Sequence, residues 1–281
     1  MAFTTIVAPR ELYERLGSPG LVVIDCRHSL ADFALGRRWY DESHIPGAFF
    51  AGVEEDLAGE KTGTNGRHPL PDPDSFARFL ADLGVDDETQ IVAYDGGGDM
   101  FAARLWFLCR WIGHDAVAIL DGGLAAWTKA GYPITAAPPE RARQARITLR
   151  LHPEMVVDAR YVLANLHDPS MQLLDARAKE RFSGEIEPID PVGGHLPGAG
   201  NRWFKENFEA DGSLKSPERL RLEFERAALD PQQTVHQCGS GVSASVNVLA
   251  MEHAGLIGSR IYNGSWSEWV ADPSRPVETG S

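Results

Sequence analysis

Short apolar runs alternate along the whole chain with stretches whose apolar residues recur at helical spacing. The apolar runs have the length of buried strands, and strands are predicted at residues 21–26, 90–94, 116–120, 172–175 and 234–237. Helices are predicted at residues 10–17, 74–83, 100–112, 124–130, 153–166, 217–228 and 243–254. This alternation predicts an α/β protein in which mostly parallel sheets are flanked by helices.

The chain also repeats itself at a spacing of domain size. "VVIDCR" resembles "QLLDAR", which aligns Asp25 with Asp175 at an offset of 150, and "IVAYDGGG" resembles "TVHQCGSG", which aligns Asp95 with Cys238 at an offset of 143. Two further pairs, "SHIPGAFF" with "GHLPGAGN" and "LDGGLAAW" with "YNGSWSEW", follow in the same order. Four ordered blocks with nearly constant offset predict a duplicated domain.

The boundary between the two halves is predicted in a polar stretch that contains two prolines. "TAAPPERARQAR", residues 135–146, has no periodic pattern and is typical of a linker. We therefore expect an N-terminal domain at residues 1–134 and a C-terminal domain at residues 147–281.

The composition excludes several classes of function. Hydrophobic residues make up 43% and charged residues 24% of the chain, as in a soluble globular protein. The net charge of -13 argues against a nucleic-acid partner, and it means that an anionic substrate needs a local basic contact. No apolar run approaches the roughly 18 residues of a membrane span, and the N-terminus lacks a secretory pattern. We expect neither a membrane nor a nucleic-acid partner.

The three cysteines, Cys26, Cys109 and Cys238, lie far apart in the sequence. No pair has the spacing of metal ligands, and no disulfide framework is implied. A reducing compartment such as the cytoplasm is therefore expected.

Cys238 stands where ligands bind in open α/β sheets, directly after a predicted strand and shortly before a predicted helix. Gly239 and Gly241 allow a tight turn whose main-chain N–H groups point at one centre, toward which the helix also directs its positive end. Such a cradle favours a thiolate, which is a nucleophile at neutral pH. A buried structural cysteine is the alternative, but the matching loop of the first half has Asp95, so the turn does not require a thiol.

Taken together, these features resemble the two-domain rhodanese-like sulfurtransferases. The duplicated halves, "SHIPGA" and "GHLPGA", the strand ends "DCR" and "DAR", and the loop "CGSGVSA" carry the resemblance over nearly the whole chain. The loop is most similar to that of the 3-mercaptopyruvate sulfurtransferases, because thiosulfate-using members usually carry basic residues after the cysteine. The resemblance implies a catalytically silent N-terminal domain, which Asp95 fits, and a C-terminal domain whose Cys238 cycles through a persulfide.

The reaction implied by the resemblance is sulfur transfer in two half-steps. The thiolate takes a sulfur atom from a small anionic donor, which leaves as pyruvate if it is 3-mercaptopyruvate, and a thiol, cyanide or protein acceptor then takes the sulfur. The implied reaction requires no metal and no organic cofactor. The loop residues expected to bind the donor are Gly239, Ser240, Gly241, Val242 and Ser243.

Arg181, in "DARAKERFSG", resembles the substrate-binding arginine of the family. A guanidinium suits a carboxylate because two N–H groups can bond two oxygens at once. Arg177 is interpreted as structural. Asp190 stands where mercaptopyruvate-using relatives often carry a second arginine, and it would repel a carboxylate if it pointed inward. Thiosulfate is therefore the second choice of donor.

Ser240 and His68 are further catalytic candidates. In the family, a serine at this loop position works with a histidine and an acidic residue of the first domain, and His68 in "GRHPLPDP" matches that histidine. Glu54 and Asp56 are the candidates for the carboxylate. The histidines interpreted as structural are His44, His195 and His236.

Two other classes of protein compete with this interpretation. A cysteine phosphatase or arsenate reductase needs a longer loop that closes with an arginine, and Ala244 stands at that place. A persulfide carrier module shares the same chemistry, but it would load once and stall, whereas an enzyme turns over steadily.

Overall fold

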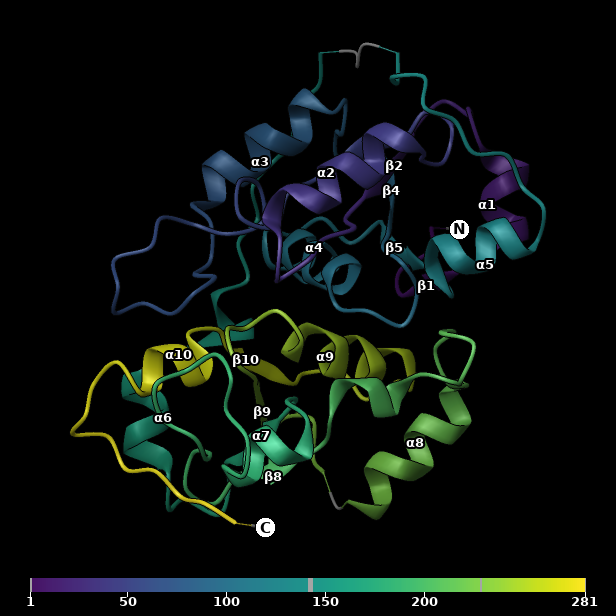
Figure 1. Ribbon diagram of the computed structural model, residues 1–281. Helices are drawn as coiled ribbons and strands as arrows, with labels where there is room; N and C mark the ends of the chain where they lie inside the picture. The colour runs from purple at the N-terminus through teal and green to yellow at the C-terminus, as the bar shows by residue number, and fades with distance from the viewer. Residues whose placement is uncertain (1, 141–143, 228, 281) are drawn as a thin grey trace. The chain divides into compact units, whose positions relative to one another are not determined.

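The computed structural model describes residues 2–140, 144–227 and 229–280. The chain forms two compact units, each built on a five-stranded parallel sheet (Figure 1). The first unit comprises Met1–Gly59, Pro71–His152 and Phe208–Leu214, and the second comprises Glu60–Leu70, Pro153–Asn207 and Lys215–Ser281. Within the described ranges, no helix has both the length and the apolar character that crossing a bilayer requires.

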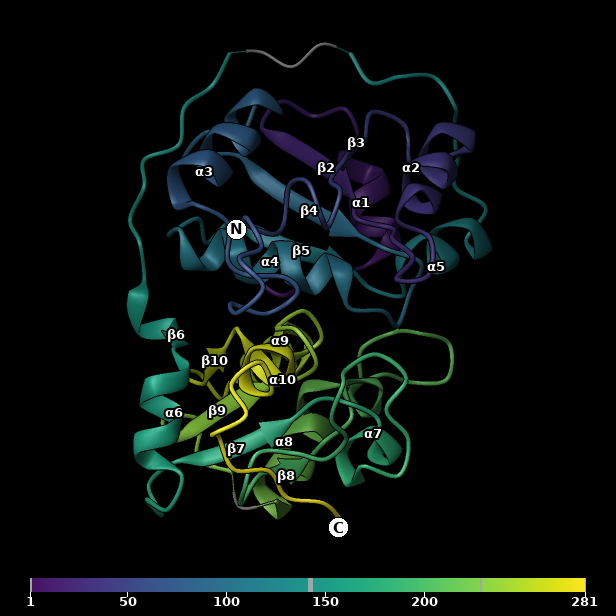
Figure 2. The same ribbon diagram turned by 60° about the vertical axis from the view of Figure 1, so that its left-hand side comes forward.

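The first sheet has the strand order β1-β5-β4-β2-β3, and its strands β2 to β5 are labelled in Figure 2. Its strands are β1 Ile6–Val7, β2 Leu21–Asp25, β3 Phe49–Phe50, β4 Gln90–Tyr94 and β5 Val117–Leu120. The helices of this unit are α1 Pro9–Arg15, α2 Phe33–Glu42, α3 Pro73–Asp82, α4 Phe101–Trp111 and α5 Gly123–Lys129. Leu12 of α1 and Trp127 of α5 join Val23 and Val92 in one core cluster, while α4 packs against β4 and β5.

The second sheet has the order β6-β10-β9-β7-β8, which repeats the first sheet position by position. Its strands are β6 Val156–Val157, β7 Gln172–Asp175, β8 Gly200–Asn201, β9 Thr234–Gln237 and β10 Arg260–Tyr262. Its helical segments are the 3-10 turns η1 Pro153–Met155 and η2 Phe204–Asn207 and the helices α6 Ala159–Asn165, α7 Lys179–Ser183, α8 Pro217–Arg226, α9 Ala244–His253 and α10 Ser265–Trp269. The prediction of duplicated α/β domains with parallel sheets is confirmed.

The helix predicted at residues 153–166 is wrong in its first part. The segment begins with η1 and continues as β6. The β-branched residues of β6 pair in the parallel sheet with β10, Val156 with Ile261 and Val157 with Tyr262. The helix α6 starts only after Asp158, whose carboxylate accepts a hydrogen bond from the N–H of Tyr161 at 2.7 Å and so caps the helix.

Five short strands, β1, β3, β6, β8 and β10, and three helices, α2, α7 and α10, are absent from the sequence prediction. Each of these strands has two or three residues, too few for a periodic pattern. The helix α2 contains Gly36, where a Cβ would collide with the carbonyl oxygen of Arg27, so the close approach of this helix to the strand end requires glycine.

Two segments belong to a unit that their position in the sequence does not indicate. Residues 60–70 belong to the second unit and residues 208–214 to the first. The predicted linker at 135–146 includes residues 141–143, and the helix predicted at 217–228 ends on residue 228; these four residues lie outside the described ranges. The predicted boundaries at 134 and 147 stay predictions.

Candidate active site

The loop after β9 forms a cradle around the sulfur atom of Cys238. The side chain is buried, and its Sγ accepts a hydrogen bond from the main-chain N–H of Gly241 at 3.1 Å. Gly241 has a φ of +83°, and a Cβ at this position would collide with the carbonyl oxygen of Asn263. Only glycine can therefore present its N–H to the sulfur in this way. The loop is fixed from the other side because the N–H of Cys238 donates to Ser265 Oγ at 3.1 Å.

The other two thiols have a different environment. Cys26 and Cys109 are buried in the first unit, and burial raises the pKa of both well above its ordinary value. They stay protonated thiols at neutral pH, and all three cysteines are free. Among the residues that the structure describes, no group of His, Cys, Asp and Glu side chains is arranged to hold a metal ion.

The structure brings Ser240 and His68 together. Both side chains are buried, and Nδ1 of His68 lies 2.8 Å from Oγ of Ser240. The carbonyl oxygen of His68 accepts a hydrogen bond from Asn263 Nδ2 at 3.1 Å, which ties the segment 60–70 to the cradle. The carboxylate expected to assist His68 stays a prediction. One candidate, Asp56, accepts a hydrogen bond from the N–H of Gly52 at 2.7 Å, and burial raises the pKa of its carboxyl group.

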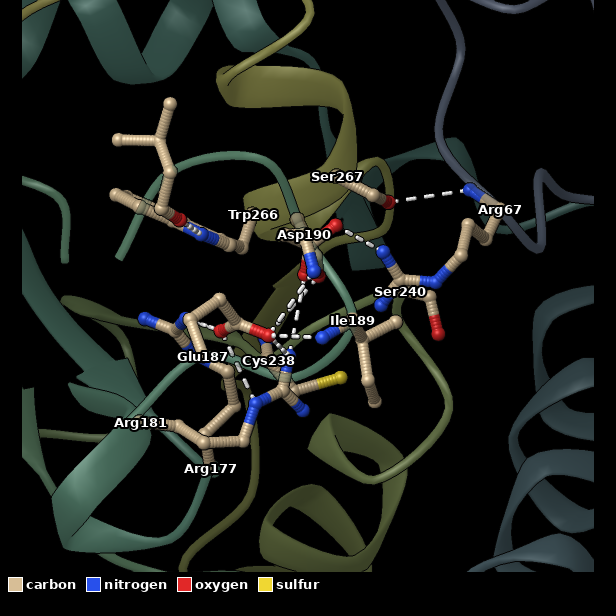
Figure 3. A network of polar contacts seen from close by, with 12 residues as sticks. Arg67, Arg177, Arg181, Glu187, Ile189, Asp190, Cys238, Ser240, Trp266 and Ser267 are labelled. Atoms are coloured by element: carbon tan, nitrogen blue, oxygen red, sulfur yellow. Dashed lines mark hydrogen bonds and ion pairs between the residues drawn. The ribbon is translucent and has the colours of Figure 1, made fainter. Parts of the chain in front are cut away.

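Two arginines converge on Gly239, directly after Cys238. A Cβ at Gly239 would lie 3.0 Å from Nη2 of Arg67 and 3.4 Å from Nη1 of Arg181. Asp190 pairs with both arginines, through Oδ1 with Nη1 of Arg67 and through Oδ2 with Nη2 of Arg181 at 3.1 Å (Figure 3). Nη2 of Arg67 and Nη1 of Arg181, the two nitrogens nearest Gly239, bond none of the described residues. They therefore remain available to an anion.

The carboxylate of Asp190 is paired with arginines, whereas the sequence analysis considered it as an acid that could repel the donor carboxylate. Its side chain is 3% exposed, and both oxygens are occupied by guanidinium groups. Glu187 holds the far side of Arg181 with bonds of 2.8 and 3.1 Å. Burial by itself raises the pKa of Glu187, but the bonds from Arg181 and from main-chain N–H groups outweigh burial and leave the pKa below its ordinary value. Glu187 is thus a carboxylate that positions Arg181.

The residues interpreted as structural have structural contacts. Arg177 pairs with Asp175 at 2.7 Å and lies over the ring of Trp266 at 4.7 Å. His44 and His195 are buried, and each bonds a main-chain carbonyl and stacks on an aromatic ring. His236 of β9 is fully buried, but neither of its ring nitrogens has a hydrogen-bond partner among the described residues.

Comparison with known proteins identifies the class to which this site belongs. Residues 8–130 and 158–272 match the family model of the rhodanese-like domain. The chain belongs to the rhodanese-like family of sulfurtransferases. The two matched segments cover both units, so the protein carries two rhodanese-like domains, and the loop of Cys238 lies in the second.

Several relatives of this family are similar over the full length. A probable 3-mercaptopyruvate sulfurtransferase of Pseudomonas aeruginosa is 44% identical over 284 residues and is covered completely, as is this chain. A thiosulfate sulfurtransferase of Cricetulus griseus is 34% identical, over 99% of this chain and 96% of the relative. Among solved structures, SseA from Escherichia coli, a 3-mercaptopyruvate sulfotransferase, has a TM-score of 0.81 at 30% identity, over 94% of this chain and 99% of that one.

Arg67 is the residue that sequence reasoning missed. Arg67 directly precedes the candidate His68 in "GRH", and this position next to a candidate residue is the signal that the sequence offers. Its approach to Gly239 depends on the main-chain bond from its N–H to Ser267 Oγ at 3.1 Å, between residues 200 positions apart. No local pattern reports such a contact.

Proposed function

We propose that this rhodanese-like protein transfers a sulfane sulfur from 3-mercaptopyruvate to a thiol, cyanide or protein acceptor through a persulfide on Cys238. The observation that carries the proposal is the N–H of Gly241 directed at the Cys238 sulfur at 3.1 Å. A main-chain donor at that distance favours a thiolate and, after transfer, the negative charge of a persulfide. The name and the full-length similarity of the Pseudomonas relative support the choice of donor.

In the first half-reaction, the Cys238 thiolate attacks the sulfur atom of the donor. A new S–S bond forms while the carbon–sulfur bond of the donor breaks, and the bonding electron pair leaves on the pyruvate enolate. The thiol proton of the donor neutralises that enolate, so pyruvate leaves and a persulfide anion remains. In the second half-reaction an acceptor nucleophile takes the outer sulfur, and the S–S electron pair returns to Cys238.

Arg67 and Arg181 are proposed to bind the donor carboxylate. Their nearest nitrogens lie at Gly239, which is adjacent to the nucleophile. Two guanidinium N–H groups from two residues can meet the two oxygens of one carboxylate. We propose that Asp190 holds both arginines in this orientation while its charge partly cancels theirs, which favours a donor with a single negative charge.

Ser240 and His68 are proposed to serve the departing enolate. The Ser240 hydroxyl can donate a hydrogen bond to the oxygen that gains negative charge, and His68 at 2.8 Å fixes the orientation of that hydroxyl. The pair can also pass a proton to the enolate.

The first domain is proposed to be catalytically silent. Asp95 replaces the cysteine, and its carboxylate accepts hydrogen bonds from the N–H groups of Gly97 at 3.0 Å and Ala102 at 3.1 Å. Burial, together with the nearby charge of Asp99, raises the pKa of Asp95 to about 7. Such a group stabilises its loop but offers no nucleophilic sulfur. We further propose that the protein works in the cytoplasm, where its three free thiols stay reduced.

Thiosulfate is the second candidate donor. Relatives named thiosulfate sulfurtransferase are 34 and 35% identical to this chain, and Asp190 resembles the acid that such enzymes tend to carry. Against thiosulfate stands the uncharged loop of residues 239–245, together with the partial cancellation of the charges of Arg67 and Arg181 by Asp190. A persulfide carrier without turnover is the third candidate, since it needs the same cradle.

The test compares kcat/KM for 3-mercaptopyruvate and thiosulfate, with cyanide as acceptor, in the wild type and in Cys238→Ser. We expect a clear preference for 3-mercaptopyruvate and no turnover in the variant. Mass spectrometry after exposure to donor alone should find the peptide of Cys238 heavier by one sulfur atom.

Cys109→Ala is the matched control, because it removes a buried thiol of the first unit and should leave the persulfide on Cys238. Equal rates with both donors would remove the donor assignment but keep the class. Turnover by Cys238→Ser would overturn the mechanism, and a single loading without further turnover would identify a carrier.

A further inference from the structure

The first unit contains a cavity at the carboxyl end of its sheet. Its volume is about 430 Å³, within the range of roughly 300–1,000 Å³ that small-molecule sites occupy. Its apolar wall consists of Trp39, Leu124 and Ala125. Arg27, His28 and Asp99 add polar side chains to the same cavity.

This cavity is the counterpart of the candidate active site in the duplicated chain. The offset that aligns Asp25 with Asp175 pairs Arg27 with Arg177, and the offset that aligns Asp95 with Cys238 pairs Gly96 with Gly239. The first domain therefore keeps a hollow at the place where the second domain holds its reactive loop, although it lacks the nucleophile. A hollow without covalent chemistry can still bind a ligand.

Arg27 has one guanidinium nitrogen to spare. Its Nε and Nη2 bond the carboxylate of Asp25, and Nη2 also bonds the carbonyl oxygens of Trp39 and Ser43. Nη1 bonds none of the described residues. Because the other nitrogens are held by the fold, Nη1 is a fixed donor next to the cavity.

His28 is a buried polar side chain of the same cavity. The residue is 7% exposed, its ring stacks on Phe33, and its Nε2 is buried without a hydrogen bond. Neither ring nitrogen bonds another residue in the described part of the chain. Burial lowers the pKa of His28, so the ring is neutral at neutral pH. Nδ1 also lacks a hydrogen-bond partner among the described residues but, unlike Nε2, is not fully buried, so it is the ring nitrogen that a ligand in the cavity can reach.

The charges of the cavity select the kind of ligand. Asp99 supplies a carboxylate, of which Oδ1 accepts a hydrogen bond from the N–H of Met100 at 2.9 Å, while the charge of Arg27 is offset by Asp25 and its Nη1 still offers N–H donors. An anion alone would face Asp99, and a cation alone would leave Arg27 Nη1 and His28 without acceptors. A zwitterion meets both requirements. We propose that this cavity binds a small apolar α-amino acid, with its carboxylate at Arg27 and His28, its ammonium group at Asp99 and its side chain against Trp39 and Leu124.

The test is calorimetric titration of the full-length protein with L-leucine, which lacks sulfur and cannot react at Cys238. Two analogues separate the charged groups: isoamylamine lacks the carboxylate, and 4-methylpentanoate lacks the ammonium group. We expect one molecule of L-leucine to bind, and each analogue to bind at least about tenfold more weakly, since each loses a charge-assisted interaction.

Two variants assign the site. Asp99→Asn should weaken L-leucine binding by at least about tenfold without changing the rate of sulfur transfer. Ala125→Phe should abolish binding by filling the cavity. Glu88→Gln, which changes an exposed acid of the same unit, is the matched control and should bind as the wild type does.

The proposal is overturned if L-leucine does not bind at about 10 mM, or if Asp99→Asn binds it unchanged. Loss of binding in Arg181→Ala together with normal binding in Asp99→Asn would move the ligand to the second domain and would also reject the proposal. If Ala125→Phe does not fold, Asp99→Asn and the two analogues decide alone.

Discussion

At the scale of single residues, Arg67, Asp190 and Arg181 form the charged group that we propose binds the donor anion. One carboxylate bonds a nitrogen of each guanidinium and leaves another nitrogen of each directed at Gly239. Buried ion pairs gain little net stability because desolvation offsets the attraction, but they do fix geometry. This geometry supports the proposal that Asp190 orients the two arginines.

Removal of the Arg181 guanidinium tests this arrangement. Arg181→Ala should lower kcat/KM for 3-mercaptopyruvate by about 10–100-fold, because the donor carboxylate loses a charge-assisted bond. Steady-state kinetics measure the effect, and Arg181→Lys should recover only part of it, since an ammonium group cannot replace the planar fork.

Arg160→Ala, which removes an exposed arginine of the same unit, should have wild-type kinetics. If Arg181→Ala also keeps wild-type kcat/KM for both donors, Arg181 has no part in donor binding.

At the scale of elements, the strand–loop–helix segment from β9 to α9 builds the sulfur cradle. The strand is buried on both faces, and α9 is buried along most of its length, from Ala244 to Met251. A rigid strand and a rigid helix leave the loop between them little freedom. Gly241 is where this loop turns, with a positive φ and with a main-chain N–H at the sulfur.

Gly241→Ala should destabilise the protein and slow alkylation of Cys238 by iodoacetamide. Alanine at positive φ costs about 1–2 kcal/mol, and the Cβ would also collide with the carbonyl of Asn263, which displaces the N–H from the sulfur. Thermal unfolding and the labelling rate measure the two effects.

Gly20→Ala separates the backbone term from the collision. Gly20 has a φ of +78° and nothing within 4 Å of a Cβ, so this variant should lose only the backbone term and keep the labelling rate. Equal losses of stability in the two variants, with equal labelling rates, would show that the loop does not depend on Gly241.

At the scale of the whole molecule, buried ionisable groups set the response to acid. Burial, with a smaller contribution from the charge of Arg202, lowers the pKa of His236 from its ordinary value of 6.5 to about 3. Between these two values the unfolded chain binds a proton that the folded chain does not bind. The contribution of His236 is therefore complete above pH 6.5 and is lost as the pH falls from 6.5 toward 3.

His236→Gln should flatten the decrease of the melting temperature between pH 7 and pH 4. Thermal unfolding at a series of pH values in this window gives the comparison. The exposed His167→Gln should keep the wild-type slope. A slope of the His236 variant equal to that of the wild type would mean that the folded protein takes up the proton at this position.

The sequence by itself determined the class of fold, the duplication and the position of the loop that carries the candidate nucleophile Cys238. These features depend on local periodicity and on the glycines of the turn, Gly239 and Gly241. Both signals lie within short stretches of sequence, so they can be recognised without the rest of the chain. Local patterns also explain the error at residues 153–166. The local sequence predicts a helix there, but Val156 pairs with β10, a distant strand that the local pattern does not report.

Only the tertiary structure decided which side chains meet around the sulfur. The contact of His68 with Ser240 joins residues 172 positions apart, and that of Arg67 with Asp190 joins residues 123 apart. The resemblance had nominated His68, but nothing nominated Arg67 or gave Asp190 its place between two arginines. Contacts at such separations depend on how the chain closes on itself, and closure is set by the packing of the whole unit rather than by any short pattern of residues.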